Sequence, residues 1–320
     1  MATIEQIKAL IRAHFNSNEE KFKTVVLQIA AHEAKVGHTA SAREIKEIIQ
    51  SSKFLNKNKV VALNKELDIL EQKMTHVHLS DLIVSVEIEE KIKRVINEYH
   101  KKDLLRKNGL MNRSKLLLAG DPGTGKTMTA SVIANELYLP LYVIQFDRLI
   151  TKYMGETSAK LRQVFDQIKE IRGVYLFDEF DAIGSDRNLD DDVGEMRRIL
   201  NSFLQNLEDD ESYSIIIAAT NNPSILDNAL FRRFDDVMEY KNPDIEQITR
   251  LFKMKLHGKA SNDIFSDDVY KEAQGLNYAD IVKACEEAVK YSILEDQLIT
   301  KNILLNYIKD RKNHYKYKEA

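Results

Sequence analysis

The feature that most constrains the fold of this sequence is an alternation of short apolar segments with longer amphipathic ones between residues 115 and 240. The short segments are almost wholly apolar, as expected of strands buried on both faces, and the longer ones repeat their apolar residues at helical spacing. This alternation predicts an α/β fold with a five-stranded parallel sheet and helices on both faces. The predicted strands are 115–119, 141–146, 173–177, 213–219 and 235–240, and the predicted helices are 88–107, 126–137, 157–171 and 193–207.

The flanking segments lack this alternation and predict helices alone. Beyond Pro243, helical spacing recurs in residues 244–257, 267–274, 278–292 and 300–312, which predicts a C-terminal helical lid subdomain. The first fifty residues contain three short helical patterns, and in the second Asn18 is the expected cap and Gly37 follows the end. Residues 51–80 are expected to be a linker with room for one more helix. We therefore predict a helical substrate- or partner-binding region with its linker (1–75), an α/β subdomain (76–242), and a helical lid with a basic tail (243–320).

Composition excludes several classes of protein. The formal net charge is −3, which argues against a protein whose main role is to coat nucleic acid. Cys285 is the single cysteine, so no internal disulfide can form, and its apolar helical surroundings predict a buried thiol. The N-terminus lacks a signal-peptide pattern, and no apolar run approaches the ~20 residues of a membrane span. We expect a soluble cytoplasmic protein with no membrane contact.

A glycine-rich segment follows the first predicted strand and opens a predicted helix. Residues 120–127, GDPGTGKT, match G-x-x-x-x-G-K-[ST], whose backbone N–H groups surround phosphate oxygens at a helix N-terminus. Lys126 is expected to contact the β- and γ-phosphates, and Thr127 to offer its hydroxyl to Mg²⁺. The residues predicted to bind the nucleotide here are Asp121, Pro122, Gly123, Thr124, Gly125, Lys126, Thr127 and Met128.

Two further strands end in residues suited to hydrolysis. Asp178 and Glu179 follow the apolar strand 173–177, at the strand end where open parallel sheets bind ligands. Asp178 is predicted to hold Mg²⁺ together with Thr127, and Glu179 to orient and polarise the attacking water. Asn221 follows strand 213–219 and can hold the same water or touch the γ-phosphate.

These motifs together resemble the AAA+ superfamily, specifically the AAA clade of protein-remodelling ATPases and the ATPase module of the katanin, spastin and FtsH type. The resemblance runs from about residue 81 to 310 through GDPGTGKT, LFDEFD, AATNNP and LDNALFRRFD. It implies a P-loop NTPase fold, ATP and Mg²⁺ as cofactors, and hydrolysis of ATP to ADP and phosphate. It also implies a catalytic role for Asn221, and it makes Arg232 and Arg233 arginine fingers that act in a neighbouring subunit's site. The alternative is that both arginines are surface charges.

The same resemblance implies a central pore. Lys152, Tyr153 and Met154 are similar to the aromatic pore loop that grips polypeptide in hexameric rings, whereas from the residues alone Tyr153 could equally be a buried anchor. Residues 275–281, GLNYADI, resemble the sensor 2 region of the clade, with Tyr278 in the place usually taken by glycine.

The main hypothesis is therefore an ATP-hydrolysing, chaperone-like motor that remodels, unfolds or threads protein substrates through the pore of a homo-oligomeric ring, expected to be a hexamer. A separately encoded effector or peptidase would be a further partner. One alternative is a nucleic-acid-linked loader or helper, against which the near-neutral charge and the Tyr153 loop argue. The other is an ATP-controlled assembly switch that recruits a separate effector through residues 1–75.

Overall fold

The structure is a computed structural model, and it describes residues 8, 19–35, 69–145, 149, 156–183, 190–223, 228–256 and 258–316. The chain divides into two compact units, Met1–Leu67 and Asp68–Ala320. In the first unit, helix α2 (Glu19–Lys35) corresponds to the predicted second helix and buries Val25, Ile29 and Ala30. Apart from Lys8, which is helical, the predicted first and third helices lie outside the described residues.

The second unit contains a six-stranded sheet with the order β1-β3-β4-β5-β2-β6. The five predicted strands all form and pair in parallel, and their bounds are β2 (Lys115–Gly120), β3 (Leu141–Gln145), β4 (Val174–Asp178), β5 (Ile215–Thr220) and β6 (Asp236–Tyr240). The predicted α/β class with a parallel sheet and a C-terminal helical subdomain is thereby confirmed.

The sixth strand, β1 (Leu70–Lys73), differs from the expectation that residues 51–80 form a linker. It pairs antiparallel with β3, with Leu70 opposite Ile144 and Lys73 opposite Leu141. Its sequence, LEQK, has no strand pattern, and Leu70 is its one buried residue. The strand forms because pairing satisfies the backbone groups along the open edge of β3, a tertiary requirement that local sequence does not record.

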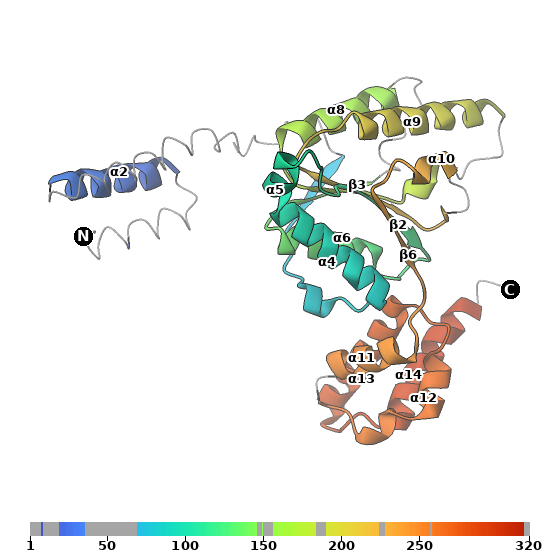
Figure 1. Cartoon of the computed structure of the whole chain (residues 1–320). Helices are drawn as coiled ribbons and strands as arrows, with labels where there is room; N and C mark the ends of the chain where they lie inside the picture. The colour runs from blue at the N-terminus through green and yellow to red at the C-terminus, as the bar shows by residue number, and fades with distance from the viewer. Residues whose placement is uncertain are drawn as a thin grey trace. The chain divides into compact units, whose positions relative to one another are not determined.

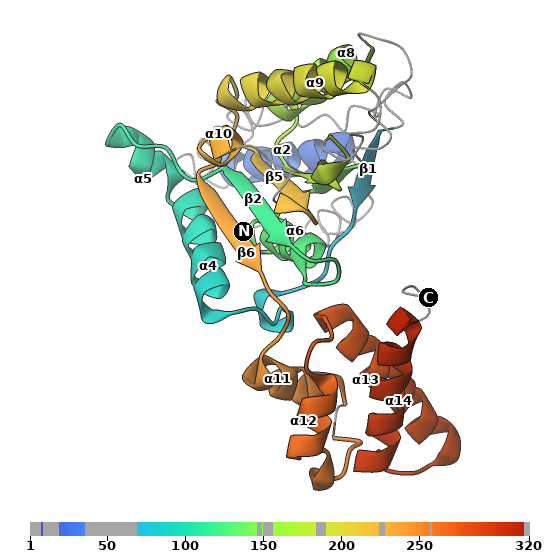
Figure 2. The same cartoon turned by 90° about the vertical axis from the view of Figure 1, so that its right-hand side faces the viewer.

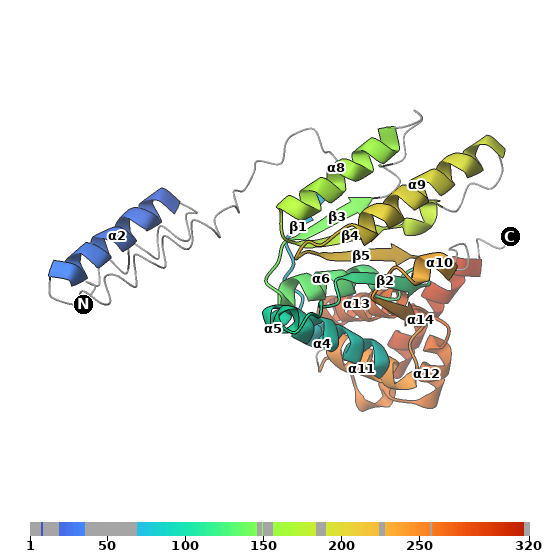
Figure 3. The same ribbon diagram turned by 45° about the horizontal axis from the view of Figure 1, so that its top comes forward.

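Helices cover both faces of the sheet (Figures 1 and 3). On one face lie α4 (Val86–His100) and α6 (Lys126–Glu136), and on the other α8 (Glu156–Glu170) and α9 (Asp190–Glu208). The predicted helix 88–107 is two helices, because the chain leaves helical geometry at Lys101 (φ −101°, ψ 14°) before α5 (Lys102–Lys107) begins. Shorter elements are η1 (Leu79–Asp81), η2 (Phe180–Ile183) and α10 (Asn228–Phe231).

Alternate residues of each strand supply the two cores. In β2, Leu116 and Leu118 join the core shared with α4 and α6, while the neighbouring residue Leu117, also fully buried, points to the opposite face. The α8 and α9 side contains a cluster of phenylalanines whose ring centroids lie 4.8–5.8 Å apart, formed by Phe165, Phe177, Phe180 and Phe203. Burial on both faces explains why the strands are uniformly apolar in sequence.

The C-terminal helices form a separate layer with its own core (Figure 2). They are α11 (Ile245–Lys255), α12 (Asp267–Ala273), α13 (Tyr278–Glu295) and α14 (Lys301–Lys316), with η4 (Asn262–Ile264) between the first two. Ile83, from the segment that precedes α4, is buried in this core. The lid therefore packs against a part of the chain that comes before strands β2–β6, although its own helices all follow them. Among the described residues, no helix combines the length and the apolar character needed to cross a bilayer.

We expect Cys285 to resist thiol reagents in the native protein. The residue is fully buried in α13, and burial raises the pKa of its thiol from 9.0 to about 12. The reactive thiolate is therefore disfavoured by folding, and labelling with a disulfide reagent at pH 8 should be slower by about 100-fold or more than in concentrated guanidinium chloride. Because the folded thiol retains its proton above pH 9, this group also makes the free energy of unfolding fall as the pH rises past that value. Rapid stoichiometric labelling of folded protein would contradict the burial of Cys285.

Candidate functional site

Three neighbouring strands place three sequence motifs at one edge of the sheet. In the order of the sheet, β4, β5 and β2 are adjacent and parallel. Their registers align Phe177 with Ala218 and Ala119 with Thr220, so the strands end at nearly the same level. The segments that follow them, 178–179, 221–222 and 120–127, therefore meet at the carboxyl edge, the usual ligand-binding edge of an open parallel sheet.

The glycine-rich loop connects β2 to α6 through conformations that other residues adopt with difficulty. Gly120 (φ 151°) passes so close to the carbonyl of Tyr240 on β6 that a Cβ atom would collide with it. Gly123 (φ 77°) lies against the side-chain amide of Asn277, which a Cβ atom would approach to 2.8 Å. Inside the loop, the hydroxyl of Thr124 donates to the carbonyl oxygen of Asp121 at 2.7 Å, which stabilises the turn. The backbone N–H groups at the start of α6 are thereby presented toward the end of the sheet, where an anion can accept from them.

Lys126 is buried at the centre of this loop. Its side chain is only 6% exposed, and its ammonium donates to the carbonyl oxygens of Gly120 (2.6 Å) and Asp121 (2.9 Å). Burial lowers the pKa of Lys126, an effect that the nearby carboxylates of Asp178, Asp181 and Asp121 oppose. A cation held in the loop in this way is suited to contact with phosphate oxygens.

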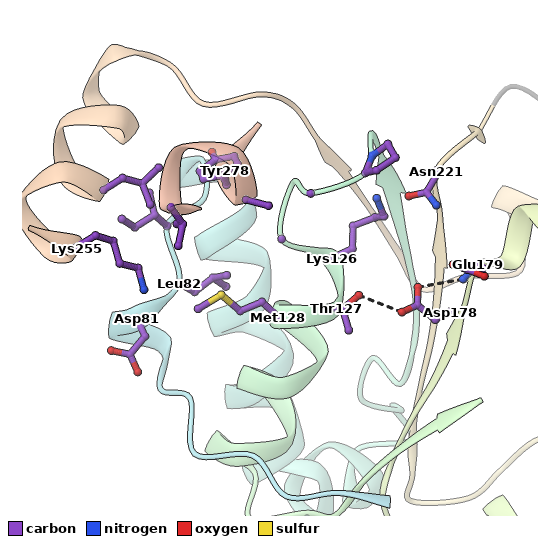
Figure 4. Close-up of a pocket in the computed structure, with 17 residues that line it drawn as sticks. Asp81, Leu82, Lys126, Thr127, Met128, Asp178, Glu179, Asn221, Lys255 and Tyr278 are labelled. Carbon is purple, nitrogen blue, oxygen red and sulfur yellow. Dashed lines mark hydrogen bonds between the residues drawn. The ribbon is translucent and has the colours of Figure 1, made fainter. Parts of the chain in front are cut away.

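Thr127 and the acid pair meet directly. The hydroxyl of Thr127 donates to Oδ2 of Asp178 at 3.1 Å, and Oδ1 of Asp178 accepts from the backbone N–H of Glu179 at 3.0 Å (Figure 4). Glu179 has a φ of 55°, a left-handed conformation that costs about 1–3 kcal/mol for a residue with a side chain. The chain thus turns sharply after β4, and Glu179 remains exposed at the cavity while Asp178 faces Thr127.

Asp181 is a residue for which the sequence analysis assigned no role. Its Oδ1 accepts from the backbone N–H of Asn221 at 3.0 Å, so a carboxylate from the segment after β4 holds the first residue after β5. In the sequence, Asp181 is visible only as the last acidic residue of LFDEFD, three residues after Asp178. That signal identifies an acidic residue but not its bond to a neighbouring strand.

These residues line a cavity of about 470 Å³ that has two chemically different ends (Figure 4). One end is polar and is formed by predicted site residues, namely Pro122, Gly123, Gly125, Lys126, Thr127, Asp178, Glu179 and Asn221. The other end is mostly apolar and combines predicted Met128 with residues that the sequence analysis did not assign to the site: Asp81, Leu82, Ile83, Leu251, Lys255, Tyr278, Ala279 and Val282. Asp121 and Thr124 are not among the described residues that line the cavity and instead shape the loop. The second end is formed between the α4 side of the sheet and the lid, so it depends on a tertiary contact that no local pattern reports.

The remaining predicted site residues lie elsewhere. Arg232 and Arg233 follow α10 and are not among the described residues that line the cavity. Arg232 is exposed, and Nε of Arg233 pairs with Oε1 of Glu208 at 3.1 Å. Lys152, Tyr153 and Met154, predicted as a pore loop, lie outside the described residues.

Comparisons with known proteins agree with this geometry. Residues 116–242 match the model of the ATPase family associated with various cellular activities (AAA). An uncharacterized AAA family ATPase of Sinorhizobium fredii is 31% identical over 304 residues, which are 92% of this chain and 91% of that protein. The ATP-dependent zinc metalloprotease FtsH of Mycobacterium leprae is 33% identical over 204 residues, 61% of this chain, and the match spans 26% of that protein. In fold, the chain is similar to the crystal structure of the FIGL-1 AAA domain, with a TM-score of 0.60, 21% identity, and coverage of 79% of this chain and 91% of that one.

We expect Asp181 to act through Asn221. Substituting Asp181→Ala removes the acceptor for the Asn221 N–H and should reduce the rate of ATP hydrolysis by about 10- to 100-fold. Asp181→Asn keeps an oxygen at the same position and should retain most of the activity. Steady-state hydrolysis assays on both variants, with circular dichroism to confirm folding, test this. Equal losses in the two variants would show that the charge of Asp181, and not its bond to Asn221, matters.

Proposed function

Because this chain belongs to the AAA family of ATPases and is itself an ATPase, we propose that it is a motor that remodels, unfolds or threads protein substrates as a homo-oligomeric ring, expected to be a hexamer. The proposal rests on one observation. The chain's own cavity is lined by the phosphate loop, the acid pair and Asn221, whereas Arg232 and Arg233 are not among the described residues that line it. A neighbouring copy would supply the missing guanidinium groups.

The polar end of the cavity suits ATP with Mg²⁺. The hydroxyl of Thr127 and the carboxylate of Asp178 are hard oxygen ligands 3.1 Å apart, the kind that Mg²⁺ takes beside nucleotide phosphates. When bound, the ion would neutralise charge on the β- and γ-phosphates. Lys126 would exchange its two loop carbonyls for phosphate oxygens, and Thr127 and Asp178 would hold the ion. Glu179 would accept the proton of the attacking water, and Asn221, held by Asp181, would keep that water in line.

The positions of Arg232 and Arg233 support the proposal of a ring. Arg232 lies on the surface and Arg233 forms one partly exposed ion pair, so neither is needed to hold the fold together. An arginine that reaches the γ-phosphate in trans stabilises the charge of the transition state and raises the rate by roughly 10³–10⁵ in well-characterised systems. A contact between two different surfaces of identical subunits repeats around an axis, and it closes into a ring when the rotation from one subunit to the next is a whole fraction of a full turn.

The choice of protein as substrate is supported by two observations. The relative from Mycobacterium leprae is an ATP-dependent protease by name, and the near-neutral net charge of this chain is unlike that of a nucleic-acid-coating protein. In this proposal Lys152, Tyr153 and Met154 contact the polypeptide in the pore, the protein works in the cytoplasm, and a separate effector or peptidase receives what the ring processes.

Substitution Glu179→Gln should separate binding from turnover. The amide keeps the size of the side chain but cannot accept a proton, so the hydrolysis rate should fall by about 10²–10⁴ while the Kd for ATP changes by less than about threefold. Light scattering should show that ATP stabilises the oligomer of this variant. With ATP bound but not hydrolysed, the Glu179→Gln protein should retain polypeptide in pull-down assays. Retention of single-stranded DNA that weakens steeply with salt would favour the nucleic-acid alternative instead, and normal ATP turnover would exclude Glu179 as the base.

Mixing two inactive variants tests whether the arginines act in trans. The double substitution Arg232→Ala with Arg233→Ala leaves the pocket intact, and Glu179→Gln leaves the arginines intact, so each alone should hydrolyse ATP at least about 100 times more slowly. Mixed rings should recover part of the activity, because some intact pockets then face intact arginines. Arg94→Ala, at an exposed position on α4, is the matched control and should be fully active. No recovery on mixing, or a fully active double variant, would contradict the cooperating ring.

A further inference from the structure

A group of positive and aromatic side chains lies at the edge of the sheet opposite the cavity. Arg172 and Tyr213 come just before β4 and β5, so they lie at the amino ends of these strands, whereas the acid pair and Asn221 follow the carboxyl ends. Tyr99 is in the last turn of α4, and Lys102 and Arg106 are one turn apart on α5. Figure 2 shows α5 at the end of α4 that is far from the lid. We name these five residues the cation–tyrosine cluster.

Cations and aromatic rings alternate through this cluster. The ammonium of Lys102 lies 4.4 Å from the ring centroid of Tyr99, and the guanidinium carbon of Arg172 lies 5.0 Å from the same centroid. Arg172 is also 5.9 Å from the ring centroid of Tyr213, and the guanidinium carbon of Arg106 is 4.1 Å from that centroid. Each ring therefore contacts two cations, and the attraction between cation and ring holds three positive charges close together.

The three cations have no acidic partner in the part of the chain that the structure describes. None of them forms an ion pair with a carboxylate there. Burial, followed by the charge of Arg172, lowers the pKa of Lys102, and the carboxylate of Asp103 opposes these effects only in part. Lys102 and Arg172 therefore repel each other beside the ring of Tyr99, and a bound anion would relieve that repulsion.

The tyrosine hydroxyls orient the two guanidinium groups and leave most of their donors free. Nε of Arg172 donates to the hydroxyl of Tyr99 at 2.5 Å, and Nη1 of Arg106 donates to the hydroxyl of Tyr213. A guanidinium has five N–H donors, so each arginine keeps an edge with two parallel donors, the arrangement that fits a carboxylate. Both arginines are exposed, so a carboxylate from outside the chain can reach these edges.

Exposed apolar side chains follow the same helix and distinguish between classes of anion. Leu104 of α5, and Leu110 and Met111 just after it, are 59%, 57% and 60% exposed. Such side chains suit apolar residues of a polypeptide and offer nothing to a phosphate backbone. Single-stranded nucleic acid binds largely by stacking its bases on aromatic rings, but Tyr99 is buried and the ring of Tyr213 contacts two of the cations. A polypeptide is therefore the favoured partner.

We propose that the cation–tyrosine cluster and α5 form a docking surface for an acidic polypeptide segment that also carries apolar side chains and belongs to a partner protein. Carboxylates of the segment bind the free edges of Arg106 and Arg172 and the ammonium of Lys102. Its apolar side chains pack on the exposed leucines and methionine of α5 and the turn after it. Because this surface lies at the amino edge of the sheet, the partner leaves the nucleotide cavity open, and the inference does not depend on the proposed ATP site.

A fluorescent synthetic peptide of repeated Glu-Glu-Leu units tests this surface in the full-length protein. The unsubstituted protein should bind the peptide, and the affinity should fall as salt is added because the charges are exposed. Arg106→Ala and Arg172→Ala should each weaken binding by about tenfold, the size of a lost hydrogen-bonded contact to a charged group. A peptide of Gln-Gln-Leu units should bind at least about tenfold more weakly, because it lacks the carboxylates.

Arg162→Ala is the matched control. Arg162 is exposed on α8, so its loss removes the same charge at a different surface and should change peptide affinity by less than about twofold. Both cluster variants should hydrolyse ATP at the unsubstituted rate within about twofold, which shows that the fold is intact. If Arg172→Ala fails to fold because buried Tyr99 loses its partner, Arg106→Ala still gives the test, since its partner Tyr213 is at the surface.

Four results would overturn the proposal. The first is that the unsubstituted protein does not bind the acidic peptide, and the second is that the cluster variants bind it as well as the control does. The third is tighter binding of single-stranded DNA that is lost in the same variants, which would assign the surface to nucleic acid. The fourth is loss of the ATP-dependent oligomer in these variants, which would make the surface a contact between copies of this chain.

Discussion

The parallel pairing of β4, β5 and β2 is the interaction on which the rest of the site depends. Each of these strands delivers one motif: the acid pair, Asn221 or the phosphate loop. The motifs are separated in sequence by tens of residues, which include the helices α6, α8 and α9. The backbone hydrogen bonds that align Phe177 with Ala218 and Ala119 with Thr220 are therefore also what brings Thr127 within reach of Asp178. A side-chain bond reinforces this alignment: the carboxylate of Asp181, after β4, accepts a hydrogen bond from the backbone N–H of Asn221, after β5.

The residues at this edge are held in arrangements that are unfavourable in isolation. Lys126 is a buried cation with a lowered pKa, and Glu179 has a left-handed backbone conformation. Such features persist where the surrounding structure determines them, and they are common where a protein binds charged ligands. Here the buried strands β4 and β5, which lie beside β2 in the sheet, provide that support, because residues 174–177 and 215–219 are almost completely inaccessible to solvent. The buried apolar strands thus stabilise the unfavourable arrangements of Lys126 and Glu179 at the carboxyl edge of the sheet.

The lid completes the cavity with different chemistry. Apart from Lys255, its contribution to the lining is apolar or aromatic, and it reaches the phosphate loop at the start of α13, where Asn277 and Ala279 both contact Gly123. Ile83, from the segment before α4, is buried in the lid core, so this segment packs against the lid as well as lining the cavity. The lid and the phosphate loop are therefore in direct contact at Gly123.

The sequence by itself determined the class of fold and the chemistry of the polar end. The apolar strands, the helical periods and G-x-x-x-x-G-K-T are local patterns, because burial on both faces and phosphate binding by a glycine loop each require particular residue types at fixed spacing. Only the tertiary structure decided the sixth strand, since LEQK is a strand solely because the edge of β3 pairs with it. The same holds for the bond from Asp181 to Asn221 and for Leu82, Leu251 and Lys255 at the apolar end, which come from separate elements. These contacts depend on the order of strands in the sheet and on the packing of the lid, and both are set by the burial of surfaces distant in the chain, which no local pattern of residues encodes.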